Sequence, residues 1–175
     1  MDRATMRVFG LAGWSGSGKT TLMTALIPEF VSRGITVSTI KHAHHSFDID
    51  QPGKDSWLHR QAGAREVMVA SGQRWALMHE LRGAAEPSLD DLLERMAEVD
   101  LVLVEGFKHH AHPKIEVYRH AVGKPLLHPE DPFIVAIASD QRLPEFSRPW
   151  LRLSDAGAIA NFILGHEAGL LRWHS

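Results

Sequence analysis

The sequence predicts a three-layer α/β fold, with a largely parallel central sheet flanked by helices and an antiparallel strand or hairpin as a candidate addition. Short β-rich runs alternate with helical segments, which is typical of βαβ units. The aliphatic run Leu101–Val104 has no polar residue, as expected for a central parallel strand that is covered on both faces. No repeat or low-complexity linker divides the 175 residues, so we expect a single domain over 1–175.

The first strand and helix follow from composition and periodicity. Arg7–Ala12 is a β-rich run that ends in a glycine-rich segment. Thr20–Arg33 carries an apolar stripe at helical spacing, and Gly34 ends it. Pro28 removes one hydrogen bond inside this helix, so we expect a kink rather than a break. Gly34–Ile40 is the second expected strand.

The middle of the chain is expected to contain small elements. Lys41–Lys54 is polar and contains a Pro-Gly pair, which predicts a loop. Asp55 is a predicted N-cap for a short helix that ends near Gly63. Glu66–Ala70 has strand composition, and Arg74–Leu81 is a candidate antiparallel neighbour.

The second half begins with a helix start signal. Ser88 and Asp91 resemble a capping box that opens a helix through Met96. The buried strand Leu101–Val104 follows and ends at Glu105. The remaining expected elements are the strands Ile115–Arg119 and Phe133–Ala138 and a closing helix from Asp155.

A glycine-rich motif lies between the first strand and the first helix. The pattern G-x-x-x-x-G-K-T has the strand-before, helix-after context that a P-loop needs. In such a loop backbone N–H groups surround phosphate oxygens, the ammonium of Lys19 reaches the β- and γ-phosphates, and the hydroxyl of Thr20 binds Mg²⁺. The sequence therefore predicts a P-loop nucleotide-binding domain of the NTPase fold. The predicted nucleotide-binding residues are Gly13, Trp14, Ser15, Gly16, Ser17, Gly18, Lys19, Thr20 and Thr21.

Glu105 occupies the position expected for a Walker B carboxylate. It ends a buried strand, so its side chain should emerge at the carboxyl edge of the sheet, where ligands bind in open α/β folds. A carboxylate there can hold Mg²⁺ through water or orient an attacking water. The alternative is an ordinary solvated glutamate. Lys19 and Glu105 are the catalytic candidates.

The polar loop after the second strand has three interpretations. Asp48 or Asp50 could complete the Mg²⁺ shell with Thr20 and Glu105; the histidines at 42, 44 and 45 could bind a transition metal; or the loop could simply be solvated. The chain has no cysteine, so a histidine site would lack thiolate ligands. A second cluster at His109, His110 and His112 has the same alternatives.

Asp140 follows the strand Phe133–Ala138 and is a candidate for reading guanine. Its carboxylate could accept from the N1–H and 2-amino groups, a donor pair that adenine lacks. An unpaired carboxylate would cost about 1–3 kcal/mol, which favours GTP about ten- to hundredfold. The alternative is a capping or turn aspartate.

Composition excludes several function classes. The formal net charge is -2, so no global positive field attracts nucleic acid or an anionic membrane. No apolar run reaches the roughly 20 residues of a membrane helix, and the first residues lack the apolar core of a signal peptide. We expect a soluble cytoplasmic protein without disulfides.

Several motifs together resemble the family of the molybdopterin-guanine dinucleotide biosynthesis adaptor protein MobB. They run in family order from about residue 7 to 140. The segments that carry the resemblance are Ala12–Thr21, Ile40–His45, Pro52–Ser56, Gln73–Met78, Leu103–Lys108 and Ala136–Asp140.

This resemblance implies a GTP-binding protein of the SIMIBI group of P-loop NTPases, usually a homodimer with weak GTPase activity and Mg²⁺ as its ion. It implies a partner, the guanylyltransferase MobA, which joins GMP to molybdopterin to form the guanine dinucleotide of the molybdenum cofactor. The chain departs from the wider class because no lysine stands at Trp14 or Ser15, where many dimeric relatives carry one that acts across the dimer. An Asn-Lys-x-Asp motif is also absent, so guanine selection by Asp140 is a hypothesis.

Two other functions use the same motif. An ATP-dependent small-molecule kinase would recruit Asp48 or Asp50 as a base, but no segment concentrates arginines as a kinase lid would. A metal-delivery GTPase would use the histidine loop.

Arg60, Arg65 or Arg74 could serve as an arginine finger. Molybdopterin or the molybdenum cofactor could dock on lysines that flank the phosphate edge, namely Lys41, Lys54, Lys108 and Lys114. The alternative is that these are solvated loop lysines.

Overall fold

The computed structural model describes residues 5–43, 47–167 and 170–172. The chain forms two compact units, of which the larger comprises Met1–His42 with Ala97–Ser175 and the smaller Ala43–Met96. The larger unit contains the main sheet and two long helices. The smaller unit contains a separate two-stranded sheet with two short helices. Each unit is described by itself.

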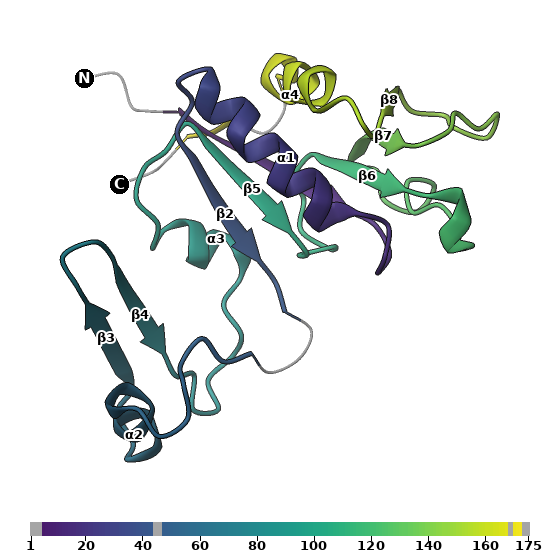
Figure 1. Cartoon of the computed structure of the whole chain (residues 1–175). Coiled ribbons are helices and arrows are strands. Elements are labelled where there is room, and N and C mark those ends of the chain that lie inside the picture. The colour runs from purple at the N-terminus through teal and green to yellow at the C-terminus, as the bar shows by residue number, and fades with distance from the viewer. Residues whose placement is uncertain (1–4, 44–46, 168–169, 173–175) are drawn as a thin grey trace. The chain divides into compact units, whose positions relative to one another are not determined.

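The main sheet is largely parallel, which confirms the predicted α/β class. Its strand order is β2-β5-β1-β6-β7-β8, every pairing along this path is parallel, and β9 pairs antiparallel with the start of β1 (Figure 1). The short strands β8 and β9 were not predicted. The strands are β1 (Thr5–Ala12), β2 (Val37–Lys41), β5 (Leu101–Glu105), β6 (Lys114–Tyr118), β7 (Ile134–Ser139), β8 (Trp150–Arg152) and β9 (Leu170–Arg172).

Two helices cover one face of this sheet, side by side in Figure 1: α1 (Lys19–Ser32) and α4 (Ala156–Gly165). The helix α1 continues through Pro28 without a break, and the kink expected there stays a prediction. The Asp155 side chain caps α4 by accepting from the backbone N–H of Ala158 at 2.9 Å. Burial of the apolar stripes of both helices against alternate strand residues drives this packing. The core includes Phe9, Leu11, Leu22, Leu26, Phe30, Leu103, Ile115, Ile159 and Ile163.

The strand β6 presents charged side chains on the opposite face. Its residues alternate, so Ile115 and Val117 enter the apolar core while Lys114 and Glu116 point away from it, and both charged side chains are buried. The Lys114 Nζ donates to the carbonyls of Lys108 and His110 at 3.0 and 2.8 Å. Buried charges need such partners to offset desolvation.

Glu116 organises the segment that follows β6. One carboxylate oxygen accepts from the backbone N–H of Leu127 at 2.7 Å, and the other accepts from that of His128 at 2.9 Å. A short 3₁₀ helix, η1 (His120–Val122), lies in this segment. Between η1 and β7, the buried carboxylate therefore fixes the backbone at Leu127 and His128.

The smaller unit contains the predicted hairpin. The strands β3 (Glu66–Ala70) and β4 (Trp75–His79) pair antiparallel. The predicted capping box is also present, because Ser88 and Asp91 bond each other's backbone at the start of α3 (Leu89–Leu93), which ends before Met96.

The first helix of the smaller unit corrects one expectation. The helix α2 (Asp55–Gln61) has Lys54, not Asp55, at its N-cap. Asp55 lies in the first turn instead, where its charge favours the positive end of the helix dipole. Nothing in the described parts of the chain is a helix long and apolar enough to cross a membrane.

Candidate functional site

The glycine-rich loop forms a tight turn at the carboxyl end of β1. Gly13 has a φ of 145°, and a Cβ there would lie only 2.5 Å from the carbonyl oxygen of Val117 on β6. Gly18, at the N-cap of α1, has a φ of 99° and no side chain to cap the helix. The first N–H groups of α1 therefore have no side-chain cap, and such a helix start binds phosphate well.

The ammonium of Lys19 lies across this loop. Its Nζ donates to the carbonyl oxygens of Gly13 and Trp14 at 2.8 and 2.9 Å. Burial lowers the Lys19 pKa from 10.5, Glu105 opposes this shift, and Lys108 and Lys41 add to it. The Lys19 ammonium is therefore attracted by the Glu105 carboxylate and repelled by the charges of Lys108 and Lys41. A bound anion would relieve the repulsion among the lysines.

The predicted Walker B residue begins a constrained turn. The Glu105 carbonyl accepts from the backbone N–H of His42 at 2.8 Å. Gly106 has a φ of 105° and packs so closely on His42 that a Cβ would lie 2.5 Å from the histidine Cβ. Phe107 also has a positive φ, 49°, which is rare for a large side chain. Such backbone geometry often occurs at functional sites because the surrounding structure holds it in place.

Trp14 joins the loop to the segment after β6. Its indole Nε1–H donates to the carbonyl of Pro125 at 2.8 Å. The ammonium groups of Lys108 and Lys124 lie 5.4 and 5.8 Å from the centre of its ring. Both distances are within the range of a cation–π interaction. Lys108 and Lys124 thus form a basic rim of the loop, with both ammonium groups against the Trp14 ring.

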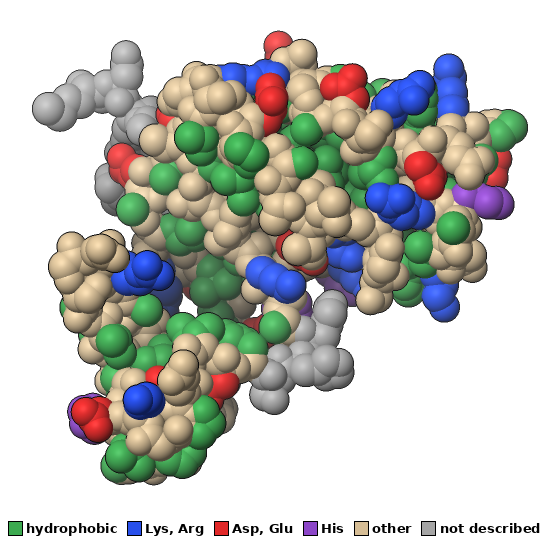
Figure 2. All heavy atoms as spheres, in the orientation of Figure 1, with side chains coloured by type: hydrophobic (Ala, Val, Ile, Leu, Met, Phe, Trp, Pro, Cys, Tyr) green, Lys and Arg blue, Asp and Glu red, His purple; other side chains and the backbone are tan. Residues whose placement is uncertain are grey.

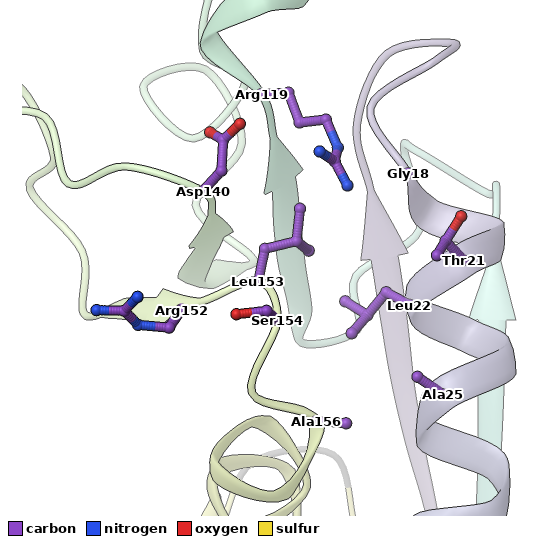
Figure 3. A pocket seen from close by; sticks show the side chains of 10 residues that line it. All are labelled: Gly18, Thr21, Leu22, Ala25, Arg119, Asp140, Arg152, Leu153, Ser154 and Ala156. Atoms are coloured by element: carbon purple, nitrogen blue, oxygen red, sulfur yellow. The ribbon is translucent and has the colours of Figure 1, made fainter.

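A pocket of about 330 Å³ lies beside the start of α1 (Figure 3). Gly18 and Thr21 line one side, and Asp140, which follows β7, lines the pocket too. The strand order therefore brings the predicted guanine-reading residue to the same pocket as the end of the P-loop. Sequence reasoning missed Arg119, which also lines this pocket and follows β6 at the same sheet edge.

The acidic residues proposed for Mg²⁺ have partners of their own. Arg60 pairs with Asp48 at 2.8 Å, with Asp50 at 3.2 Å and with Glu80 at 2.9 Å. The hydrogen bonds from Arg60 are the main cause of the lowered pKa of Asp48. Magnesium coordination by Asp48 or Asp50 stays a prediction, and it would have to compete with this arginine. Arg60 itself is held by carboxylates rather than presented as a finger.

The histidine clusters show no metal site in the described ranges. His44 and His45 lie outside the described residues. In the second cluster the Nδ1 atoms of His110 and His112 are 3.1 Å apart. Across residues 5–43, 47–167 and 170–172, no group of three or more His, Asp or Glu side chains is arranged to hold a metal ion.

One of the four candidate docking lysines is buried, so its expected position at the surface was wrong. Lys114 is 1% exposed and pairs with Asp131, so it cannot present its charge to a cofactor at the surface. The alternation of β6 places it on an inner face. The charges of Lys41 and Lys108 lower the pKa of Lys19. Lys54 belongs to the smaller unit.

Comparison with known proteins identifies the family. The family model described as molybdopterin guanine dinucleotide synthesis protein B, MobB, matches residues 8–140. The chain is 45% identical over 159 residues to the molybdopterin-guanine dinucleotide biosynthesis adapter protein of Haemophilus influenzae, covering 89% of this chain and 86% of that protein. It is 44% identical over 163 residues to the Escherichia coli K12 protein of the same name, covering 90% and 91%.

The fold agrees with this match. A crystal structure of molybdopterin-guanine biosynthesis protein B superimposes with a TM-score of 0.72 at 31% identity, covering 90% of this chain and 96% of that one. The matched segment, 8–140, begins in β1 and ends at the residue that lines the pocket after β7. The P-loop, the Glu105 turn and the pocket residue Asp140 therefore all lie within it, and the chain belongs to the MobB family.

Proposed function

We propose that this protein is a GTP-binding adaptor with weak GTPase activity that assists a MobA-type guanylyltransferase in forming the molybdopterin guanine dinucleotide. The observation that carries the proposal is a match at 45% identity over 89% of the chain to a protein named as an adapter of this biosynthesis. The P-loop at the end of β1 gives that role a nucleotide-dependent element. Neither of the two relatives compared by sequence is named as a kinase or a metal-delivery protein.

The residues at the loop fit a nucleoside triphosphate with Mg²⁺. The uncapped start of α1 and the ammonium of Lys19 offer donors to phosphate oxygens. Thr20, on the first turn, and Glu105, at the end of β5, would hold the ion directly or through water. When bound, Mg²⁺ neutralises phosphate charge. The P-loop would orient the phosphates, and Glu105 would orient an attacking water.

Guanine selection is assigned to Asp140. Its position in the pocket beside Gly18 and Thr21 supports this role, because a nucleotide with its phosphates in the loop would extend its base toward that pocket. Slow hydrolysis fits with Arg60 being engaged by three carboxylates. An arginine finger typically contributes a factor of about 10³–10⁵ to hydrolysis.

A homodimer formed through the hairpin unit is part of the proposal. A two-stranded sheet alone is marginally stable, and among the described residues no third strand pairs with β3 or β4. Its strands nevertheless expose large apolar side chains, and Trp75 is 66% exposed and Met68 61%. Hydrophobic side chains are visible on the surface of this unit in Figure 2. An exposed apolar patch of this kind typically marks an interface. We expect a second copy of the chain there, in the cytoplasm, with no nucleic acid and no membrane involved.

Calorimetric titration with Mg-GTP and then Mg-ATP tests the nucleotide assignment. We expect GTP to bind at least about tenfold more tightly, and Asp140→Asn to reduce that preference, because the amide cannot accept both guanine hydrogen bonds. Equal or tighter ATP binding by the wild type would overturn the guanine assignment and favour the kinase alternative.

Co-purification with a MobA-type guanylyltransferase tests the adaptor role. The complex should depend on whether this protein holds GTP, and Lys19→Ala should abolish that dependence. If the two proteins fail to associate in any nucleotide state, or if molybdopterin binds the transferase equally well without this chain, the adaptor role is wrong.

A further inference from the structure

Arg119 occupies the position between the P-loop and the candidate base-reading residue. The strand β6 pairs in parallel with β1 on one side and with β7 on the other. The P-loop follows β1, Arg119 follows β6 and Asp140 follows β7, so the three meet the same edge of the sheet in that order. A nucleotide that extends from the loop to Asp140 must pass Arg119.

One nitrogen of Arg119 is used by the loop itself. Its Nε–H donates to the carbonyl oxygen of Ser17 at 3.1 Å. The guanidinium also fills the space beside Gly18, where a Cβ would lie 3.1 Å from Nε and 3.4 Å from Nη2. The guanidinium is therefore positioned against the P-loop backbone and has little freedom to turn.

The two terminal nitrogens of Arg119 have no acceptor among the described residues. The side chain lines the pocket that Thr21 and Asp140 also line, and Figure 3 shows it directed toward Gly18. A guanidinium has only donors, so its partner must be an acceptor, such as the oxygens of a phosphate. Its planar fork matches two oxygens of a phosphate.

We propose that Arg119 binds the α-phosphate of the guanine nucleotide while its Nε–H fixes the P-loop through Ser17. This proposal rests on the proposed GTP binding and adds a residue to that site. Arg119 would then distinguish a nucleotide from a shorter phosphate compound. The loop and Lys19 hold the terminal phosphates, and Arg119 holds the phosphate that carries the nucleoside.

Titrations of wild type and Arg119→Gln with Mg-GTP, Mg-GDP and Mg-pyrophosphate test the inference, with pyrophosphate measured by competition. Pyrophosphate fills the terminal phosphate positions without an α-phosphate next to a nucleoside. We expect Arg119→Gln to weaken GTP and GDP about 10- to 100-fold, the range for losing hydrogen bonds to a charged group, and to change pyrophosphate less than about threefold.

Two variants serve as controls. Arg148→Gln removes a positive charge from an exposed residue that forms no ion pair within the described part of the chain, and it should leave all three affinities unchanged. Arg119→Lys keeps the charge but cannot make both contacts, so it should show an intermediate loss of GTP affinity. It also replaces Arg119→Gln as the deciding variant if that protein does not fold, as judged by circular dichroism.

The outcomes distinguish a failure of the Arg119 contact from a failure of the proposed GTP binding. If wild type binds no guanine nucleotide, the proposed function fails. If wild type binds GTP but Arg119→Gln binds it equally well, only the role of Arg119 is wrong. Equal losses for GTP and pyrophosphate would show that Arg119 merely supports the loop, which also overturns the α-phosphate contact.

Discussion

The ammonium of Lys114 lies 3.0 Å from the Oδ2 of Asp131, and the lysine side chain is only 1% exposed. This ion pair joins β6 to the segment just before β7. The same ammonium bonds the Lys108 carbonyl, so it also anchors the backbone of a residue at the rim of the P-loop. The buried ammonium of Lys114 thus stabilises the backbone next to the P-loop.

Asp131→Asn should destabilise the fold, because a buried ammonium would lose the carboxylate that pairs with it. We expect a loss of about 2–4 kcal/mol in the free energy of unfolding, measured by urea denaturation. The double variant Lys114→Met/Asp131→Asn removes the buried charge and should recover part of that loss. Unchanged stability of Asp131→Asn would show that the two carbonyl partners of Lys114 suffice.

Gly106→Ala should disturb the turn after Glu105. An alanine there adopts an unfavourable φ and meets the Cβ of His42 at 2.5 Å. We expect this variant to lose about 2–4 kcal/mol in the free energy of unfolding.

Gly123→Ala is the matched control for the Gly106 variant. Its φ is also positive, at 65°. Nothing lies within 4 Å of the added Cβ, so only the backbone conformation is penalised. That penalty should be about 1–2 kcal/mol. Equal urea midpoints for the two variants would contradict close packing at Gly106.

Stability should fall in acid partly because of His112. Its pKa is lowered to about 4, mainly by burial and also by the charges of Lys114 and His110, while a backbone hydrogen bond with His110 and the charge of Asp131 oppose the shift. Between pH 6.5 and 4 the unfolded chain therefore takes up a proton that the folded chain does not. Folding loses roughly 3 kcal/mol as the pH falls through this window. His112→Gln should show a shallower pH dependence of unfolding than wild type, whereas exposed His120→Gln should match wild type. Parallel curves for all three proteins would refute this assignment.

Trp75→Ser should convert the proposed dimer to a monomer. The tryptophan is 66% exposed on β4. Its apolar area is the largest contribution that one residue of the hairpin could make to an interface. Light scattering after size exclusion gives the mass directly. Val31→Ser, at a 58% exposed position on α1, should remain dimeric. A dimeric Trp75→Ser protein would show that the interface lies elsewhere. A monomeric wild type would show that there is no such dimer.

Local signals in the sequence determined the elements that build the site. The P-loop pattern lies between a strand and a helix because its glycines permit the turn that both require, and the structure has that order. The capping box at Ser88 and the hairpin Glu66–Ala70 with its neighbour were also predictable, since each depends on residues close together in the chain. The family match follows from the same segments.

Only the tertiary structure decided what depends on contacts between distant residues. The strands β8 and β9 have three residues each, too few to show a periodicity. They form by pairing with strands distant in the sequence, β8 with β7 and β9 with the start of β1. The burial of Lys114 follows from the face that β6 turns inward, and the role inferred for Arg119 follows from the strand order. The sequence by itself determined where a phosphate-binding loop would form, at Gly13–Thr20. Which side chains surround that loop was decided by the sheet, because parallel pairing gathers residues at one edge that lie far apart along the chain.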